Sequence, residues 1–139
     1  MFAKNQGGGV AGESRANDPV TIVIFGASGD LTHRKLIPAL FMDFAQDLLP
    51  EKFSIIGLAR RDYDDAVFRQ MMTDAIKEFS RISVDDALVE TFVKHIHYHK
   101  GDISKPEAYA ELKQRLDGSE AYPENRLFLK NLDFQRSLI

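Results

Sequence analysis

The chain has 139 residues, of which 44% are hydrophobic, and this is enough to fill the core of one domain of ordinary size. Its net charge of −3 and its pI near 5.8 provide no broad basic surface, so neither nucleic acid nor an anionic membrane is expected as a partner. The absence of cysteine excludes disulfides and zinc–thiolate sites. Because no apolar run approaches the roughly 20 residues of a membrane span, we expect a soluble, cytoplasmic protein.

The first third of the chain predicts a tail, a strand and a helix. Residues 1–18 are rich in glycine and polar residues and should form a flexible tail. Residues 20–25 are β-branched and apolar on both faces, as is typical of a central parallel strand covered by helices. A helix is predicted from Asp30 until Pro50 closes it, and Pro38 within it should bend its axis.

The middle of the chain repeats this alternation. Residues 53–59 predict a second buried strand, and the following helix carries an apolar stripe from Val67 to Phe79 behind the acidic residues 64–65. Ser83 is predicted to cap a further helix. The third strand is expected at residues 96–100.

The last part of the chain adds one more helix and one more strand. Residues 104–107, Ser-Lys-Pro-Glu, match a capping box, and the helix that they open should bury Tyr109, Leu112 and Leu116. Residues 125–129 would form the fourth strand. The order of the elements predicts an α/β fold, a Rossmann-like doubly wound parallel sheet that is truncated after about four strands.

The turn between the first strand and its helix is a candidate phosphate site. Glycines at positions 26 and 29 would let the backbone approach a ligand, and the first N–H groups of the helix would face an anion. Ser28 stands where the full dinucleotide fingerprint has a glycine, and a tight turn that binds nothing is the alternative. His33, Arg34 and Lys35 crowd the first helical turn, either to face a pyrophosphate or as a solvated basic turn.

Arg60 ends the second strand, at the point where a doubly wound fold holds the adenosine ribose. An acidic residue there favours NAD, whereas an arginine accommodates the 2′-phosphate of NADP, so Arg60 indicates NADP. The alternative is that Arg60 and Arg61 are surface charges paired with Asp62 or Asp64.

Three histidines alternate at positions 95, 97 and 99. On an extended strand they would project from one face, a spacing that can bind a metal. No carboxylate shares their alternation, so packed or solvent-facing histidines are favoured and no metal site is predicted. No nucleophile with its base, no carboxylate pair and no general base is identified, so no catalytic residue is predicted either.

The segment from Ile24 to Leu40 reads IFGASGDLTHRKLIPAL and strongly resembles the N-terminal signature of the glucose-6-phosphate dehydrogenases. The similarity continues through residues 48–50 and 56–60, weakens over the next two helices, and returns at Tyr98-x-x-Gly101-Asp102 and at residues 125–128. The resemblance implies an NADP-linked enzyme that oxidises glucose 6-phosphate to 6-phosphogluconolactone in the oxidative pentose phosphate pathway. It also implies that Arg60 meets the 2′-phosphate, while the pyrophosphate is lined by Gly26, Ala27, Ser28, Gly29, Asp30, Leu31, Thr32 and His33.

Residues 129–139 depart from the family, whose second domain carries the sugar-phosphate site and the catalytic base. We therefore expect a tail at 1–18, an NADP-binding domain at 19–128 and a divergent tail at 129–139. The expected protein is a truncated or frame-shifted fragment, inactive alone and binding glucose 6-phosphate only if the missing domain is supplied. A stand-alone NADP-binding or regulatory module is the alternative. The shortened sheet should leave Val23, Phe25, Ile55 and Leu127 poorly covered.

Overall fold

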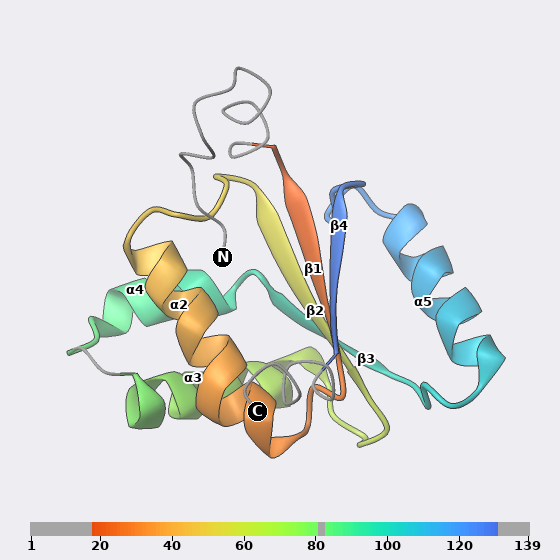
Figure 1. Cartoon of the computed structure of the whole chain (residues 1–139), viewed down its shortest axis with the longest axis horizontal. Helices are drawn as coiled ribbons and strands as arrows, with labels where there is room; N and C mark the ends of the chain where they lie inside the picture. Colours follow the sequence, from red (N-terminus) through yellow and green to blue (C-terminus); the bar gives the residue numbers. More distant parts are fainter. Residues whose placement is uncertain (1–17, 81–82, 131–139) are drawn as a thin grey trace.

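The computed structural model describes residues 18–80 and 83–130, which form a parallel four-stranded sheet with helices on both faces (Figure 1). The strands are β1 (Val20–Phe25), β2 (Phe53–Ala59), β3 (Ile96–Lys100) and β4 (Arg126–Lys130). Their order in the sheet is β3-β2-β1-β4. From β1 the chain therefore adds β2 and then β3 on one side, and β4 pairs with the other side of β1. The predicted α/β fold is confirmed. Most of the two predicted tails lies outside the described residues, although β4 extends to Lys130.

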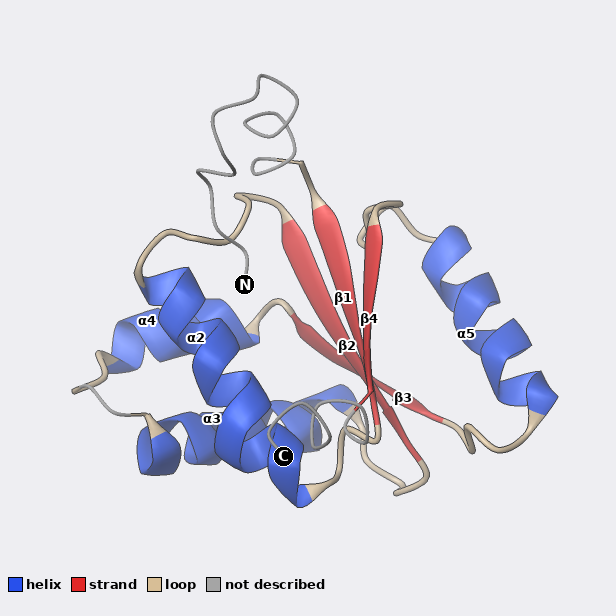
Figure 2. Cartoon of the chain, viewed as in Figure 1, coloured by secondary structure: helices blue, strands red, loops and turns tan. Residues whose placement is uncertain are grey.

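Helices cover the two faces of the sheet unequally, as Figure 2 shows. One face carries a π-helical turn η2 (Thr32–Leu36), α2 (Ile37–Ala45), α3 (Asp65–Phe79) and α4 (Asp86–Val93). The other face carries α5 (Pro106–Asp117). None of the helices in the described part of the chain is long and apolar enough to cross a membrane.

Every residue of β1 and β2 is buried, because both faces of these central strands are packed. The larger core contains Ile24 and Ile55, and the smaller one joins Val23 and Phe25 to Leu112 and Leu116 of α5. The expectation that Val23, Phe25 and Ile55 would be poorly covered is therefore wrong. On β4, the outer strand, Leu127 and Phe128 remain 36% and 52% exposed.

The helix predicted to run through Pro38 is divided instead of simply bent. Residues 32–36 form a π turn, closed by the Ile37 N–H donating to the Thr32 carbonyl, and Pro38 lies in the first turn of α2. A proline has no N–H to donate, so the first turn is the helical position that tolerates it best.

Two predicted caps are wrong, and in both cases a neighbouring aspartate competes successfully for the backbone. Asp85, and not Ser83, accepts the capping hydrogen bond of α4. The N-cap of α5 is Lys105, since the Ser104 hydroxyl donates to Asp102 at 2.7 Å. The acidic start predicted for α3 is confirmed, because Asp64 caps that helix.

The buried stripes of two helices are shifted from those predicted. In α5, Ala108 packs on the sheet with Leu112 and Leu116, at helical spacings of four, whereas Tyr109 is 45% exposed. In α3, Val67 is 47% exposed and the burial begins at Phe68.

Candidate functional site

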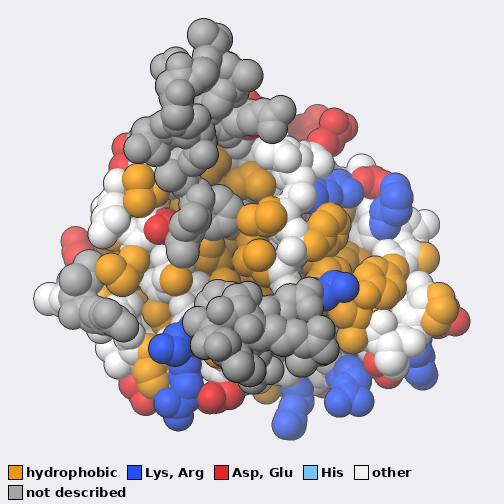
Figure 3. Space-filling model, viewed as in Figure 1, with side chains coloured by type: hydrophobic (Ala, Val, Ile, Leu, Met, Phe, Trp, Pro, Cys, Tyr) orange, Lys and Arg blue, Asp and Glu red, His pale blue; other side chains and the backbone are white. Residues whose placement is uncertain are grey.

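A cavity of about 380 Å³ lies at the carboxyl ends of β1, β2 and β3. In an open parallel sheet this is the edge at which ligands bind. Its lining residues come from the three segments that leave these strands: Gly26, Ser28, Gly29, Leu58, Ala59, Arg60, Gly101, Asp102, Ile103 and Ser104. Figure 3 shows several Lys and Arg side chains along the lower margin of the molecule, where β1 and β2 end in Figure 1.

The glycine turn forms one wall of this cavity. Gly26 has a φ of 74°, in the left-handed region that favours glycine. The N–H groups of Gly26 and Ala27 donate to the Leu58 carbonyl at 2.9 and 3.1 Å, and the Gly29 N–H donates to the Gly26 carbonyl at 3.0 Å. The turn is thereby tied to the end of β2.

Gly57 allows this close approach of the turn to the sheet. A Cβ at Gly57 would lie 2.6 Å from the Ala27 Cβ and 2.8 Å from the Phe68 Cζ, both too short for unbonded carbons. Ala27 and Thr32, both predicted site residues, have fully buried side chains. They contribute to the site by packing the turn and not by lining the cavity.

The remaining predicted residues of this segment lie on the helical turn beside the cavity. Asp30 forms an exposed ion pair with Arg34 at 2.9 Å. The His33 Nδ1 lies 2.9 Å from the Gly29 carbonyl oxygen and donates to it, which ties the helix to the glycine turn. Of the predicted site residues, the cavity is lined by Gly26, Ser28, Gly29 and Arg60, and it is not lined by Ala27, Asp30, Leu31, Thr32 or His33.

Arg60 lies at the rim of the cavity with an exposed side chain. Within the described residues it makes no ion pair or hydrogen bond, and the carboxylates considered as its partners are otherwise engaged. Asp62 lies 3.8 Å from the Lys100 Nζ, and Asp64 caps α3 by accepting from the Val67 N–H at 2.8 Å. The Arg60 guanidinium is therefore available to an anion in the cavity.

Tyr98 holds the segment that carries Arg60. Its hydroxyl donates to the Arg61 carbonyl at 2.6 Å, and its ring packs against Tyr63 and Phe68. Burial raises the pKa of the Tyr98 hydroxyl to about 12, so the hydroxyl keeps its proton and remains a donor.

Asp102 is a residue of the cavity that sequence reasoning missed. Its Oδ1 accepts from the Ser104 hydroxyl at 2.7 Å and from the Ser104 N–H at 3.0 Å. These hydrogen bonds, with the nearby Arg60 charge, hold the pKa of the carboxyl below its usual range. Two signals were available in the sequence: its position just after the predicted third strand, and its place in the Tyr98-x-x-Gly101-Asp102 segment that resembles the family.

The three histidines are half-buried, in agreement with the packed arrangement that the sequence favours over a metal site, but they do not share one face. His95 precedes β3 and stacks on Phe53 at a centroid distance of 4.0 Å. His97 and His99 lie within β3, and burial lowers the pKa of each. Across residues 18–80 and 83–130, no group of three His, Cys, Asp or Glu side chains could hold a metal ion.

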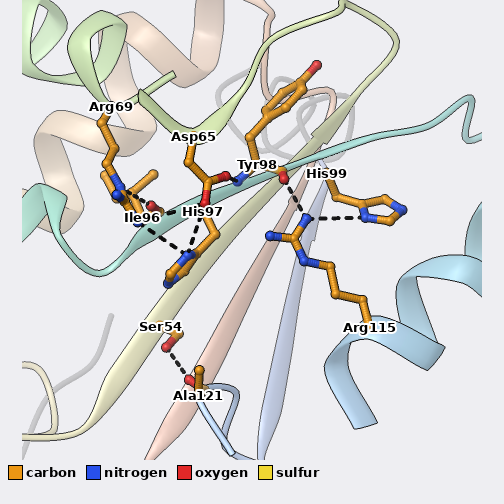
Figure 4. Close-up of polar contacts among 9 residues, drawn as sticks. All are labelled: Ser54, Asp65, Arg69, Ile96, His97, Tyr98, His99, Arg115 and Ala121. Carbon is orange, nitrogen blue, oxygen red and sulfur yellow. Dashed lines mark hydrogen bonds and ion pairs between the residues drawn. The ribbon is translucent and has the colours of Figure 1, made fainter. Parts of the chain in front are cut away.

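Side chains block the outer edge of β3, as Figure 4 shows. Asp65 accepts from the Tyr98 N–H at 2.8 Å, and the Arg69 Nε donates to the Ile96 carbonyl at 2.7 Å. Arg115 of α5 donates to the Tyr98 carbonyl at 2.5 Å. Three outward backbone groups of this strand, the Ile96 carbonyl and both groups of Tyr98, are thus occupied by side chains, which hinders pairing with another strand.

A second cavity, of about 490 Å³, lies where α5 ends and β4 begins. Its charged lining residues are Asp117, Glu120, Glu124 and Arg126, and Arg126 is paired with Asp117 at 2.8 Å, so the lining has a net negative charge. This acidic lining would repel a phosphate, so the cavity at the carboxyl ends of the strands is the better anion site.

Known proteins are similar to this chain in both sequence and fold. The family described as the NAD-binding domain of glucose-6-phosphate dehydrogenase matches residues 23–132. The chain belongs to this family. The resemblance predicted from the sequence is confirmed, and so is the class of coenzyme that it implies, a nicotinamide adenine dinucleotide.

The similar relatives are much longer than this chain. The glucose-6-phosphate 1-dehydrogenase of Chlamydia pneumoniae is 38% identical over 117 residues, which are 82% of this chain and 23% of the relative. That of Leuconostoc mesenteroides is 35% identical over 96 residues, or 69% of this chain and 19% of the relative. A solved glucose-6-phosphate dehydrogenase in complex with glucose 6-phosphate superimposes with a TM-score of 0.70 at 32% identity, over 83% of this chain and 24% of that one. The Mycobacterium avium enzyme gives 0.67 at 27% identity, over 83% and 23%.

Proposed function

We propose that the chain binds NADP in the cavity at the carboxyl ends of β1, β2 and β3. The pyrophosphate would lie on the turn from Gly26 to Gly29, where the backbone is close and the start of the helix is electropositive. Residues 30–33 would hold this turn, through the His33 contact with the Gly29 carbonyl and the Thr32 hydroxyl, which donates to the Gly26 carbonyl at 3.5 Å. Residues 19–128 would be the binding unit, with 1–18 and 129–139 outside it.

Arg60 carries the preference for NADP over NAD. Its guanidinium lies on the cavity and makes no ion pair or hydrogen bond with the described residues, although the Asp102 carboxylate is near enough to interact with its charge. The 2′-phosphate is the group by which NADP differs from NAD. A charge-assisted hydrogen bond contributes about 1.5–3 kcal/mol, which corresponds to about tenfold or more in affinity.

Calorimetric titration of both dinucleotides tests this proposal. Wild type should bind NADP at least about tenfold more tightly than NAD, and Arg60→Ala should remove most of this preference. Arg61→Ala is the matched control, because Arg61 has the same charge but does not line the cavity. Equal affinities of the wild type for the two dinucleotides would contradict the proposal.

We further propose that this domain serves the oxidation of glucose 6-phosphate in the cytoplasmic oxidative pentose phosphate pathway. The similarity to glucose-6-phosphate 1-dehydrogenases supports this role, and the chain spans about a fifth to a quarter of their length. Arg60 and Asp102 are the charged groups among the cavity's lining residues, and both would lie on the side of the adenosine. We infer that this chain supplies coenzyme binding, while sugar binding and proton removal belong to other parts of such an enzyme.

A further inference from the structure

We propose that the Asp102 carboxylate accepts a hydrogen bond from the 6-amino group of the coenzyme's adenine. This inference rests on the proposed function and adds to it the recognition of the base. The cavity would then select adenine dinucleotides over dinucleotides whose base carries an oxygen at position 6.

The order of the strands places Asp102 on the side of the base. A dinucleotide in this fold crosses the sheet at the switch between β1 and β4, with its adenosine toward β2 and β3. Arg60 leaves the end of β2, where the ribose lies, and Asp102 leaves the end of β3, one strand further out. Both residues line the same cavity as the glycine turn, so one extended ligand can reach all three.

The wall around Asp102 suits a flat, apolar ring. Leu58, Ala59 and Ile103 line the cavity there, and Ile103 is 37% exposed although it is apolar. Gly101 adds no side chain between them. A purine could therefore place its faces against apolar groups while its edge meets the carboxylate.

The hydrogen bonds of Asp102 leave one oxygen available. Oδ1 takes both hydrogen bonds from Ser104, which fixes the orientation of the carboxylate, whereas Oδ2 makes none with the described residues. The lowered pKa keeps the group ionised near neutral pH, so it can only accept. An amine on the base can satisfy such an acceptor, and a carbonyl oxygen would be repelled by it.

Titration of NADP and of its deamino analogue, in which hypoxanthine replaces adenine, tests this contact. Wild type should bind NADP on the order of tenfold more tightly than the analogue. Asp102→Asn should abolish or reverse this preference, because its oxygen stays with Ser104 and its amide NH2 then faces the base as a donor, which suits an oxygen at position 6 and not an amine. The asparagine oxygen can still accept from Ser104, and a thermal unfolding curve checks that the variant folds.

Asp62→Asn is the matched control. Asp62 is an exposed acid of the neighbouring loop, its side chain is 89% exposed, and it does not line the cavity. Its removal should change both affinities by the same factor. If Asp102 only shapes the turn before α5, its substitution should also act equally on both dinucleotides, and that result would overturn the inference.

The outcomes separate this inference from the proposed function. A wild type that binds NADP and the analogue equally well contradicts the amine contact alone. A wild type that binds neither contradicts NADP binding, and with it the contact to the base.

Discussion

Replacement of Gly57 by alanine should displace the glycine turn from the sheet. The new Cβ would lie 2.6 Å from the Ala27 Cβ and 2.8 Å from the Phe68 Cζ, whereas carbon atoms prefer about 3.5–4.0 Å, so one side must move by about 1 Å. Ala27 and Phe68 are both fully buried and have little room to move. Overpacking of this kind costs about 1–3 kcal/mol, and we expect the free energy of unfolding to fall by that amount.

Chemical denaturation of wild type and Gly57→Ala measures this change, and NADP titration of the same samples follows the turn. NADP affinity should fall together with stability, because the displaced turn is the proposed pyrophosphate site. The double variant Gly57→Ala/Ala27→Gly removes the shorter of the two contacts and should recover part of the loss, as a coupled pair does. Unchanged stability in Gly57→Ala, or a double variant that is no better than the sum of its single changes, would refute the close-approach argument.

Three further outcomes are expected. Tyr98→Phe loses the hydrogen bond to the Arg61 carbonyl, so thermal or chemical denaturation should show a loss of about 1 kcal/mol, and calorimetry should show weaker NADP binding. Burial lowers the pKa values of His97 and His99 below those of the unfolded chain, so the unfolded state takes up more protons and stability should fall as the pH drops through and below about 6.5. Denaturation of a variant with glutamine at both positions, between pH 7.5 and 5, should show a flatter profile. The purified chain should not reduce NADP with glucose 6-phosphate, because no residue that lines the cavity is placed to remove the proton of the sugar's C1 hydroxyl. Formation of reduced nicotinamide, measured by its absorbance, at a rate proportional to the amount of chain would contradict this.

Where a strong local signal and the packing agreed, the sequence predicted the fold well. The apolar run before Gly26 and the stripe behind Asp64 gave β1 and α3, because burial on both faces and an acidic N-cap leave clear patterns. Predictions of helix caps failed where a side chain had more than one possible hydrogen-bond partner. Ser104 matches a capping residue, yet its hydroxyl donates to Asp102 instead of accepting from an N–H group of the helix. Local spacing does not distinguish these two hydrogen bonds.

The candidate site was predictable only in part. The glycine turn and Arg60 follow strand ends that the sequence marks, so their place at the carboxyl edge could be inferred. That Ala27 faces the core, and that Tyr98 fixes the segment after β2, depends on contacts between residues about 30 to 40 positions apart. No local pattern encodes those contacts. The alternating histidines likewise suggested a shared face, which the turn at residues 94–95 before β3 prevents.

The most direct test of the account is to locate the bound dinucleotide by following backbone amide chemical shifts of the isotopically labelled chain during an NADP titration. Saturable shifts are expected at residues 26–31, at Arg60 and at residues 101–104, the three segments around the proposed site. The acidic cavity at residues 116–126 should remain unaffected and serves as the internal control. Shifts confined to residues 116–126, or no saturable shift at the glycine turn, would show that this edge of the sheet does not bind the coenzyme.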